Sequence, residues 1–314
     1  MSSLDTADSA RGREPESARG REDEEPDHAP TEPAKEGGKG RGKESGKESG
    51  KESGKEPGAD SGDDVAEPEG AAPVAGGKKG EDPDSKLLHA ATPLPSLDEL
   101  RAAMSWAFQG LEVEDSVLER YAEHARAVLE GNQRMNLTAI VLPKEVAAKH
   151  YLDSWRATRI VPLMGRSLLD IGTGAGFPGV PIALAEPHAK VGLLDSLKKR
   201  SDFVGETIAK LGIKNAFAVH ERAEDHLARN RYDIVLMRAI SSVRENVRLL
   251  RKVRHSHKDL LMFKGPSWSR EVRAAEREAE RLGFRLDTVI EHKLPDEMGD
   301  RAILVYRAPG GHGS

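Results

Sequence analysis

The chain has 314 residues, with 48 Lys+Arg against 53 Asp+Glu and a formal net charge of −5. It contains no cysteine, which excludes disulfides, zinc–thiolate sites and a cysteine nucleophile. The N-terminal residues lack the apolar core of a signal peptide, and no apolar run reaches the ~18 residues that span a bilayer. We therefore expect a cytoplasmic protein with no membrane partner, and the sequence suggests no metal site.

The charge is unevenly distributed. Residues 1–90 carry 14 basic and 23 acidic side chains, a net of −9, so the remainder has a net of +4. The first aromatic residue is Trp106, and residues 42–58 read GKESGKESGKESGKEPG. Such a segment buries too little apolar surface to offset the entropy of ordering. We expect a disordered tail over 1–95, acting as a solvated linker or as a tethering arm, and a disordered C-terminus over 310–314.

Three helices are expected next, forming a helical flank over residues 96–160. Ser96 precedes an acidic first turn, which is typical of a helix start, and predicts a helix over 96–108. Apolar residues at helical spacing predict a second helix over 117–131, which ends at a glycine. The segment 144–158 makes the third.

From residue 161 to 309 the pattern changes to short apolar runs separated by polar segments that suit helices. The expected strands are 167–171, 191–195, 216–220, 232–237, 259–263, 286–292 and 302–307. The expected helices are 197–211, 222–229, 242–254 and 267–282. Alternation of this kind predicts a doubly wound α/β domain, a parallel sheet with helices on both faces. The last two strands have no room for a helix between them, so they should pair antiparallel at one edge.

The segment DIGTGAGFPGVP, residues 170–181, follows the first strand of this domain. Ligands of such sheets lie beyond the carboxyl ends of the strands, so this loop should form the floor of a site. Gly172 and Gly174 allow a tight turn with positive φ, and we expect Gly176 to leave bare backbone for a ligand. Residues 174–179 formally satisfy GxGxxG, so a dinucleotide is a competing ligand.

Electrostatics separates the two ligands. Asp170 ends the strand directly before the first glycine, and its carboxylate would repel a pyrophosphate but attract an ammonium and a sulfonium. S-adenosylmethionine carries both positive groups. Asp195, at the end of the second strand, could bind ribose hydroxyls of either ligand. This reasoning favours a methyl donor, with a nicotinamide-dependent oxidoreductase as the alternative.

Further motifs, taken together, resemble those of a known protein family. Besides the glycine loop, the chain contains NLTAI (136–140), HYLDS (150–154), LLDSLKKR (193–200), RAE (222–224), MRA (237–239) and FKG (263–265). In this order, over about residues 96–307, it resembles the bacterial glucose-inhibited division protein B family, which methylates ring nitrogen 7 of a guanine in 16S ribosomal RNA. The resemblance implies a Rossmann-like class I fold with a seven-stranded, mostly parallel sheet, an antiparallel edge hairpin and an N-terminal helical cap. It also implies S-adenosylmethionine as cofactor, 16S RNA or the small ribosomal subunit as partner, and a monomer.

Residue roles follow from the same resemblance. Gly172 and Phe177 would line the cofactor pocket, and Ala223 and Glu224 would face the adenine. Arg238 would lie near the cofactor and the incoming guanine, although an ion pair with Asp170 or Glu224 is its structural alternative. For His150 and Asp153, within HYLDS, the sequence does not distinguish a role in positioning the substrate from a role in supporting the structure.

The expected chemistry requires orientation and no general base, because nitrogen 7 of guanine has a lone pair and no proton. The absence of cysteine argues against a pyrimidine carbon acceptor, and MRAISS (237–242) lacks the proline typical of enzymes that methylate exocyclic amines. RNA binding would depend on phosphate contacts. The candidate cations are Lys198, Lys199, Arg200, Arg244, Arg248, Arg251, Lys252 and Lys264. A solvated helix face, a small-molecule methyltransferase and a non-enzymatic RNA-binding module are the alternatives.

Overall fold

A computed structural model describes residues 93–309, so the expected tail over 1–92 and the end over 310–314 lie outside the described residues. Its N-terminal helices are α2 (Leu97–Ala107) and α3 (Asp115–Met135), which confirms the first two expected helices. Ser96 and Glu99 form a capping box at the start of α2, since each side chain accepts a hydrogen bond from the other's backbone N–H. The third expected helix is divided into α4 (Pro143–Val146), the π-helix η1 (Ala147–Leu152), α5 (Asp153–Trp155) and the 3₁₀-helix η2 (Arg156–Arg159).

All seven expected strands are present in one sheet of order β3-β2-β1-β4-β5-β7-β6. They are β1 (Ser167–Ile171), β2 (Lys190–Asp195), β3 (Ala216–His220), β4 (Tyr232–Arg238), β5 (His257–Lys264), β6 (Arg285–Lys293) and β7 (Asp300–Arg307). Only β7 runs against its neighbours, and it lies between β5 and β6. The antiparallel hairpin is therefore confirmed at one end of the sheet.

Five helices connect these strands: α6 (Gly179–Ala185), α7 (Lys198–Lys210), α8 (Ala223–Arg229), α9 (Val243–Leu249) and α10 (Trp268–Arg281). The helix expected over 242–254 was too long. After Leu249 the backbone forms tight turns, in which the N–H of Arg251 bonds to Arg248 and that of Val253 to Leu250. The chain needs these turns because β5 begins at His257 and it must reverse direction first. Helix α6 covers the apolar run VPIALA (180–185), where the sequence predicted no helix.

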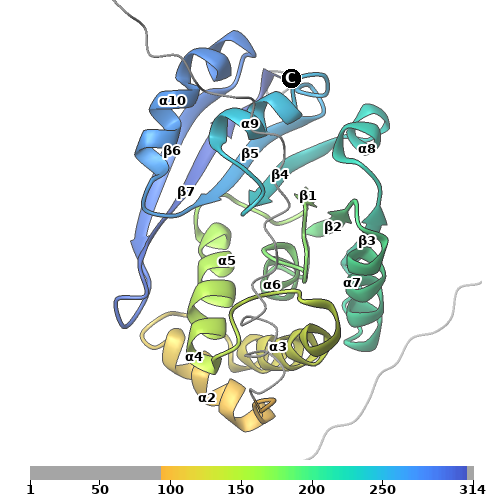
Figure 1. Cartoon of the computed structure of the whole chain (residues 1–314), viewed down its shortest axis with the longest axis vertical. Helices are drawn as coiled ribbons and strands as arrows, with labels where there is room; N and C mark the ends of the chain where they lie inside the picture. Colours follow the sequence, from red (N-terminus) through yellow and green to blue (C-terminus); the bar gives the residue numbers. More distant parts are fainter. Residues whose placement is uncertain (1–92, 310–314) are drawn as a thin grey trace, which may run out of the picture. The chain divides into compact units, whose positions relative to one another are not determined.

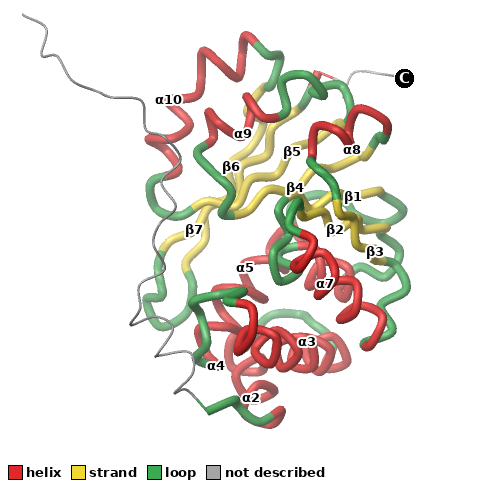
Figure 2. Tube along the Cα trace, turned by 45° about the vertical axis from the view of Figure 1, so that its right-hand side comes forward, coloured by secondary structure: helices red, strands yellow, loops and turns green. Residues whose placement is uncertain are grey.

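The helices cover both faces of the sheet (Figures 1 and 2). Successive side chains of a strand point to opposite faces, so Leu168 packs with α3, α6 and α7 while Leu169 packs with α8, α9 and α10. The same alternation holds for Leu193 and Leu194. Burial on both faces explains why the strands read as continuous apolar runs.

The α2–α3 flank shares its core with one face of the sheet. Leu100 and Tyr121 belong to the same buried cluster as Leu168 and Ile234, and the Tyr121 hydroxyl donates to the Pro181 carbonyl at the start of α6 over 2.9 Å. The flank therefore fixes the position of the loop between β1 and α6. Among the described helices, none is both long and apolar enough to cross a bilayer.

Candidate functional site

The glycine loop turns sharply at the carboxyl end of β1. Gly172 and Gly174 adopt φ of 67° and 60°, values that favour glycine. The N–H groups of Gly172 and Thr173 both donate to the Leu194 carbonyl, at 2.8 and 3.0 Å, which ties the turn to β2. Gly172 is exposed and Gly174 is half-buried, so these two residues present open backbone at the edge of the sheet.

Gly176 and Phe177 lie on the inner side of this loop and are buried, and their contact with a cofactor stays a prediction. Gly176 has φ of 100°, and a side chain there would collide with Val180 and approach His124. Phe177 is 8% exposed, and its ring stacks on His150 with 4.5 Å between centroids. The glycine at 176 is required by backbone conformation and close packing, and Phe177 anchors the loop to the helical flank.

Asp170 is also beneath the loop and not at its entrance. It is fully buried, and its Oδ2 accepts hydrogen bonds from Thr173 Oγ1 at 2.6 Å and from the Gly179 N–H at 2.9 Å. Burial raises the pKa of Asp170 to about 7. A buried carboxyl that is partly protonated at neutral pH does not repel a pyrophosphate as an exposed carboxylate would. Asp170 therefore shapes the turn, and the electrostatic argument against a dinucleotide does not hold.

Asp195 connects the glycine loop with the turn before α7. Its Oδ2 accepts from the Gly174 N–H at 3.1 Å and its Oδ1 from the Leu197 N–H at 2.9 Å. Leu197 itself is 53% exposed and Ile240 37%, and the Ile240 side chain lies 3.3 Å from where a Cβ of Gly172 would be. Exposed apolar groups beside a carboxylate and bare backbone suit a ligand with a flat apolar part and hydroxyl groups.

Ala223 and Glu224 open α8, directly after β3. Ala223 is buried and Glu224 is half-buried. The N-cap residue Arg222 makes no side-chain capping bond, so the backbone N–H groups of this first turn are not satisfied by a cap. Both positions lie at the edge of the sheet that holds the glycine loop, and their contact with an adenine stays a prediction.

Arg238, the last residue of β4, is bound by one turn of the flank helices. Its Nη2 donates to His150 Nδ1 at 2.6 Å and its Nη1 to Ser154 Oγ at 3.2 Å. Asp153 Oδ2 lies 3.6 Å from Nη1, and His292 Nε2 contacts the other Asp153 oxygen at 3.0 Å. The expected ion pair with Asp170 or Glu224 is absent among the described contacts, and Asp153 takes that place. This arrangement brings β4, the flank and β6 together.

Residue Ala239 follows Arg238 and adopts φ of 53°. A left-handed conformation is unusual for a residue with a side chain, and it often marks a functional turn. Here it directs Ile240 toward the glycine loop. The sequence did not indicate this, because the conformation of Ala239 depends on its surroundings and not on its own preference.

Several residues of the site were missed by sequence reasoning. His124 of α3 accepts a hydrogen bond from the Tyr151 hydroxyl at 2.7 Å and contacts the Ala175 backbone. Burial lowers the pKa of His124 to about 3, so it is neutral at pH 7. A histidine at an apolar position of a helix, such as His124, is only a weak sequence signal for a residue that supports a site. The sequence around His292 carries no such signal.

A cavity of about 480 Å³ lies beside Arg238, at the ends of β4 and β5. Its lining combines cationic, acidic and apolar side chains. They include Ile140, Lys149, Asp153, Arg238, Ile240, Phe263, Lys264, Glu271 and Arg301. Because Ile240 also contacts the glycine turn, the cavity and the turn are adjacent. A molecule in the cavity can therefore reach a ligand held on the turn.

Lys264 lines this cavity, but its ammonium group is committed to the protein. It donates to the Ser241 carbonyl at 2.6 Å and to Glu271 at 2.8 Å, and its side chain is only 9% exposed. The same Glu271 oxygen accepts from the Val243 N–H at 3.0 Å. Lys264 thus holds the loop after β4 in place, and its contact with RNA phosphates stays a prediction.

The remaining cations fall at two edges of the sheet. Lys198, Lys199 and Arg200 open α7 and follow the carboxyl end of β2, so they lie at the edge that holds the site. Arg244 donates to the Ala274 carbonyl, and Arg248 pairs with Glu278 at 3.0 Å.

Arg251 and Lys252 lie at the opposite edge, because α9 runs back across the sheet before β5 begins. Of the candidate cations in this part of the chain, Arg244 and Arg248 therefore contact α10, and Arg251 and Lys252 lie at the far edge.

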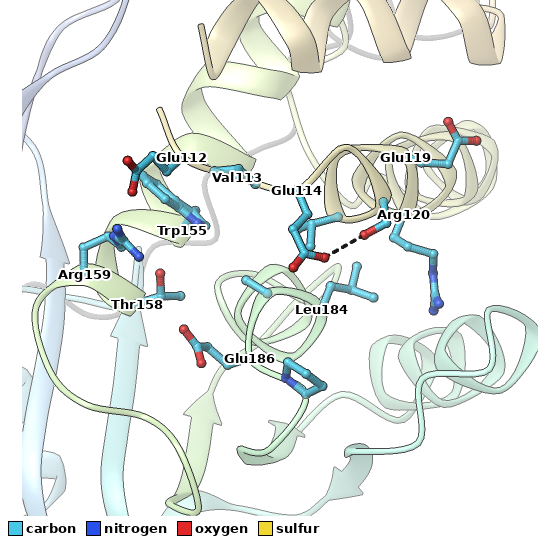
Figure 3. Close-up of a pocket in the computed structure, with 14 residues that line it drawn as sticks. Glu112, Val113, Glu114, Glu119, Arg120, Trp155, Thr158, Arg159, Leu184 and Glu186 are labelled. Atoms are coloured by element: carbon cyan, nitrogen blue, oxygen red, sulfur yellow. Dashed lines mark hydrogen bonds between the residues drawn. The ribbon is translucent and has the colours of Figure 1, made fainter. Parts of the chain in front are cut away.

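Another cavity, of about 630 Å³, lies away from this site (Figure 3). It is enclosed by the loop before α3, by η2 and by the end of α6, near the amino-terminal edge of the sheet. Glu112, Glu114, Glu119 and Glu186 outnumber Arg120 and Arg159 in its lining. No residue predicted for the site lines it, and its negative charge opposes phosphate binding.

Comparison with known proteins now decides between the alternatives. Residues 116–298 match the family model GidB, described as rRNA small subunit methyltransferase G. The chain belongs to this family. It is similar to the Ribosomal RNA small subunit methyltransferase G of Carboxydothermus hydrogenoformans, with 34% identity over 203 residues, covering 63% of this chain and 86% of that protein. The protein of the same name from Desulforamulus reducens is 37% identical over 212 residues, covering 66% and 87%.

The matched range includes every residue predicted for the site, from Asp170 to Lys264. Membership in the family agrees with the sheet order 3-2-1-4-5-7-6 and its single antiparallel strand, which is the class I methyltransferase fold. It also removes the oxidoreductase alternative, which the electrostatics of Asp170 alone could not do. Within the described residues, no group of three or more His, Asp or Glu side chains is placed to hold a metal ion.

Proposed function

We propose that this protein transfers a methyl group from S-adenosylmethionine to ring nitrogen 7 of a guanine in small-subunit ribosomal RNA. Membership in the rRNA small subunit methyltransferase G family supports the reaction class and the RNA substrate. The observation that carries the proposal in the structure is the adjacency of the open glycine turn and the cavity beside Arg238. In this proposal the glycine turn binds the methyl donor, and the cavity receives the guanine base.

The residues of the glycine turn fit S-adenosylmethionine. The space that a Cβ would take at Gly174 is open, with the nearest atom at 3.9 Å, so the cofactor can lie on bare backbone. Asp195 keeps acceptor capacity beyond its two backbone partners and would take ribose hydroxyls. Leu197 and Ile240 offer exposed apolar surface to the adenosyl part. The bound cofactor supplies an electrophilic methyl group.

The cavity offers no free general base, which suits nitrogen 7 as the acceptor. Its two carboxylates are occupied: Asp153 by Arg238 and His292, and Glu271 by Lys264 and the Val243 N–H. Nitrogen 7 carries no proton, so the protein has to orient the base and exclude water. Phe263 and Ile240 supply apolar walls for a flat ring.

Arg238 is the residue best placed to orient guanine. A guanidinium has five N–H donors, and His150 and Ser154 occupy three of them. In the described part of the chain, the Nε–H and one Nη2–H have no partner. These donors suit the O6 acceptor next to nitrogen 7, and adenine has an amino group at that position. Arg238 therefore gives the site a preference for guanine.

The test is methyl transfer from radiolabelled S-adenosylmethionine to small-subunit RNA that lacks the modification, as free RNA and as assembled subunits. We expect label in RNA, released after hydrolysis as 7-methylguanine. Label at any other atom of the base would contradict the acceptor proposed here. Transfer only to small molecules would contradict the RNA substrate.

A further inference from the structure

We propose that His150 is a positioning residue for methyl transfer, which aims the Arg238 guanidinium into the cavity by accepting its hydrogen bond at Nδ1 while Nε2 is held by Thr138. The inference rests on the proposed function, since it concerns how Arg238 meets the guanine. It assigns a role to the histidine of HYLDS, which sequence reasoning left open between substrate positioning and structural support.

The contact geometry determines the protonation state of His150. Arginine has donors and no acceptor, so His150 Nδ1, 2.6 Å from Arg238 Nη2, must present its lone pair. The single proton of the neutral ring is then on Nε2, which donates to Thr138 Oγ1 at 3.0 Å. Burial lowers the pKa of His150 well below 6.5, and the positive charges of Arg238 and Lys149 lower it further. The acceptor form therefore persists at neutral pH.

Thr138 is itself fixed, so the imidazole cannot turn freely. The Thr138 backbone exchanges two hydrogen bonds of 2.9 Å with the buried side chain of Asn132 in α3. Its hydroxyl also accepts from the Ile140 N–H at 3.0 Å. The path from α3 through Thr138 and His150 to Arg238 is a continuous series of hydrogen bonds. The position of the guanidinium is thus set by the helical flank and not by β4 alone.

The π-helix η1 brings three groups onto Arg238. His150 lies in η1, and the side chains of Asp153 and Ser154, in the next turn, contact the same guanidinium. The Phe177 ring lies 5.7 Å from the Arg238 guanidinium carbon and stacks on His150. Turns of π-helix occur often at functional sites. Together these contacts hold the guanidinium at the wall of the cavity that Arg238 lines.

Two substitutions separate the bond to Arg238 from the bond to Thr138. His150→Asn keeps an acceptor at the position of Nδ1 and loses the Nε2 donor, whereas His150→Gln keeps a donor near Nε2 and loses the acceptor. We expect single-turnover transfer to small-subunit RNA to fall roughly 10- to 100-fold in His150→Gln, the size expected when a buried charged donor loses its partner. His150→Asn keeps the acceptor for Arg238 but loses the bond to Thr138. Its loss should therefore be clearly smaller than that of His150→Gln and similar to that of Thr138→Val. Both should bind S-adenosylmethionine like the unchanged protein.

The opposite order, or equal losses in both variants, would overturn the inference, because His150 would then act only through Thr138 or through its stacking on Phe177. Calorimetric binding of S-adenosylmethionine checks that each variant is folded. His257→Gln is a matched control, since His257 is another buried histidine, which lies at the start of β5 at the opposite edge of the sheet. It should leave transfer unchanged.

A second pair of variants leaves His150 intact. Thr138→Val removes the acceptor that holds Nε2, and we expect slower transfer with unchanged cofactor affinity. Thr138→Ser restores the hydroxyl and should restore the rate. Full transfer in Thr138→Val would contradict the positioning role even if the His150 variants did not fold. Failure of the unchanged protein to methylate RNA would instead contradict the proposed function, and the inference with it.

Discussion

At the scale of single residues, the buried polar side chains around the glycine loop hold the elements of the proposed site in place. Asp170, His124 and His150 each lie within the protein, and each bonds to a backbone or side-chain group that shapes the site. Substitutions of these residues should therefore act through geometry. Their effects differ from those expected of a charge that attracts a ligand directly.

Substitutions of Asp170 distinguish an effect through the geometry of the loop from direct attraction of the ligand by a charge. In Asp170→Ala, Thr173 Oγ1 and the Gly179 N–H lose their acceptor, so we expect the free energy of unfolding to fall by roughly 2–4 kcal/mol, with weaker binding of S-adenosylmethionine. Asp170→Asn keeps an acceptor oxygen without a charge and should bind the cofactor nearly as the unchanged protein does. Urea unfolding and calorimetry measure both. A loss in Asp170→Asn as large as in Asp170→Ala would show that the charge itself attracts the cofactor.

The buried His124 leads to a prediction of how the stability of the protein depends on pH. Its pKa is lowered from 6.5 to about 3 in the folded protein, so between these values the unfolded chain binds a proton that the folded chain does not. Stability should therefore fall as pH decreases below 6.5, by about 1.4 kcal/mol per pH unit from this group. His124→Gln should remove that part of the slope in urea unfolding measured from pH 7 to pH 4. An unchanged slope would contradict the buried neutral histidine.

Asp170 acts in the opposite direction over part of this range. Its folded pKa of about 7 exceeds the ordinary value of 3.8, so the folded chain holds a proton that the unfolded chain releases. Its contribution to stability decreases as pH rises from about 4 to 7. The comparison of His124→Gln with the unchanged protein cancels this effect, because Asp170 is present in both.

At the scale of elements, helix direction decides which cations are near the site. Helix α7 begins at the carboxyl end of β2, so Lys198 and Lys199 lie at the edge where the glycine loop is. Helix α9 runs back across the sheet and leaves Arg251 and Lys252 at the opposite edge. Lys198 and Lys199 therefore lie closer to the proposed site of methyl transfer than Arg251 and Lys252, although the two pairs carry the same charge.

We expect Lys198→Ala with Lys199→Ala to weaken binding to small-subunit RNA more than Arg251→Ala with Lys252→Ala. For every phosphate that a variant no longer binds, the slope of log affinity against log salt concentration should become shallower by about 0.7–0.9. Filter binding at several salt concentrations measures this slope for each double variant. Equal slopes in the two variants would mean that RNA binds at both edges of the sheet.

At the scale of the whole molecule, the site needs the helical flank as much as the sheet. The flank supplies His124, His150 and Thr138, and its apolar side chains belong to the same buried cluster as those of the sheet. Every residue assigned to the site lies between positions 93 and 309.

Deletion of residues 1–90 should therefore leave the affinity for S-adenosylmethionine unchanged. The physical reason is that the cofactor contacts proposed above all arise from the turns after β1, β2 and β3 and from the loop after β4. Calorimetry on the full chain and on the shortened chain compares the two affinities directly. A severalfold difference would show that the tail takes part in cofactor binding, contrary to its interpretation as a linker.

Much of the fold could be predicted from the sequence because its signals are local. The strands were found as apolar runs, and the start of α2 was found from Ser96, a capping residue before a periodic segment. Helix α6 and the end of α9 could not be predicted in this way. For α6 the reason is that a short apolar run suits a buried helix or a strand equally well. The turns that end α9 depend on where β5 begins.

The sequence by itself determined the alternation of strands and helices, the glycine turn after β1 and the motifs that indicate the family, because each depends on residues close together in the chain. Only the tertiary structure decided that Asp170 and Phe177 support the loop from beneath, that Lys264 holds a neighbouring loop, and that His150 and Thr138 fix Arg238. Those contacts join residues far apart in the chain, so their partners are set by how the helical flank packs on the sheet.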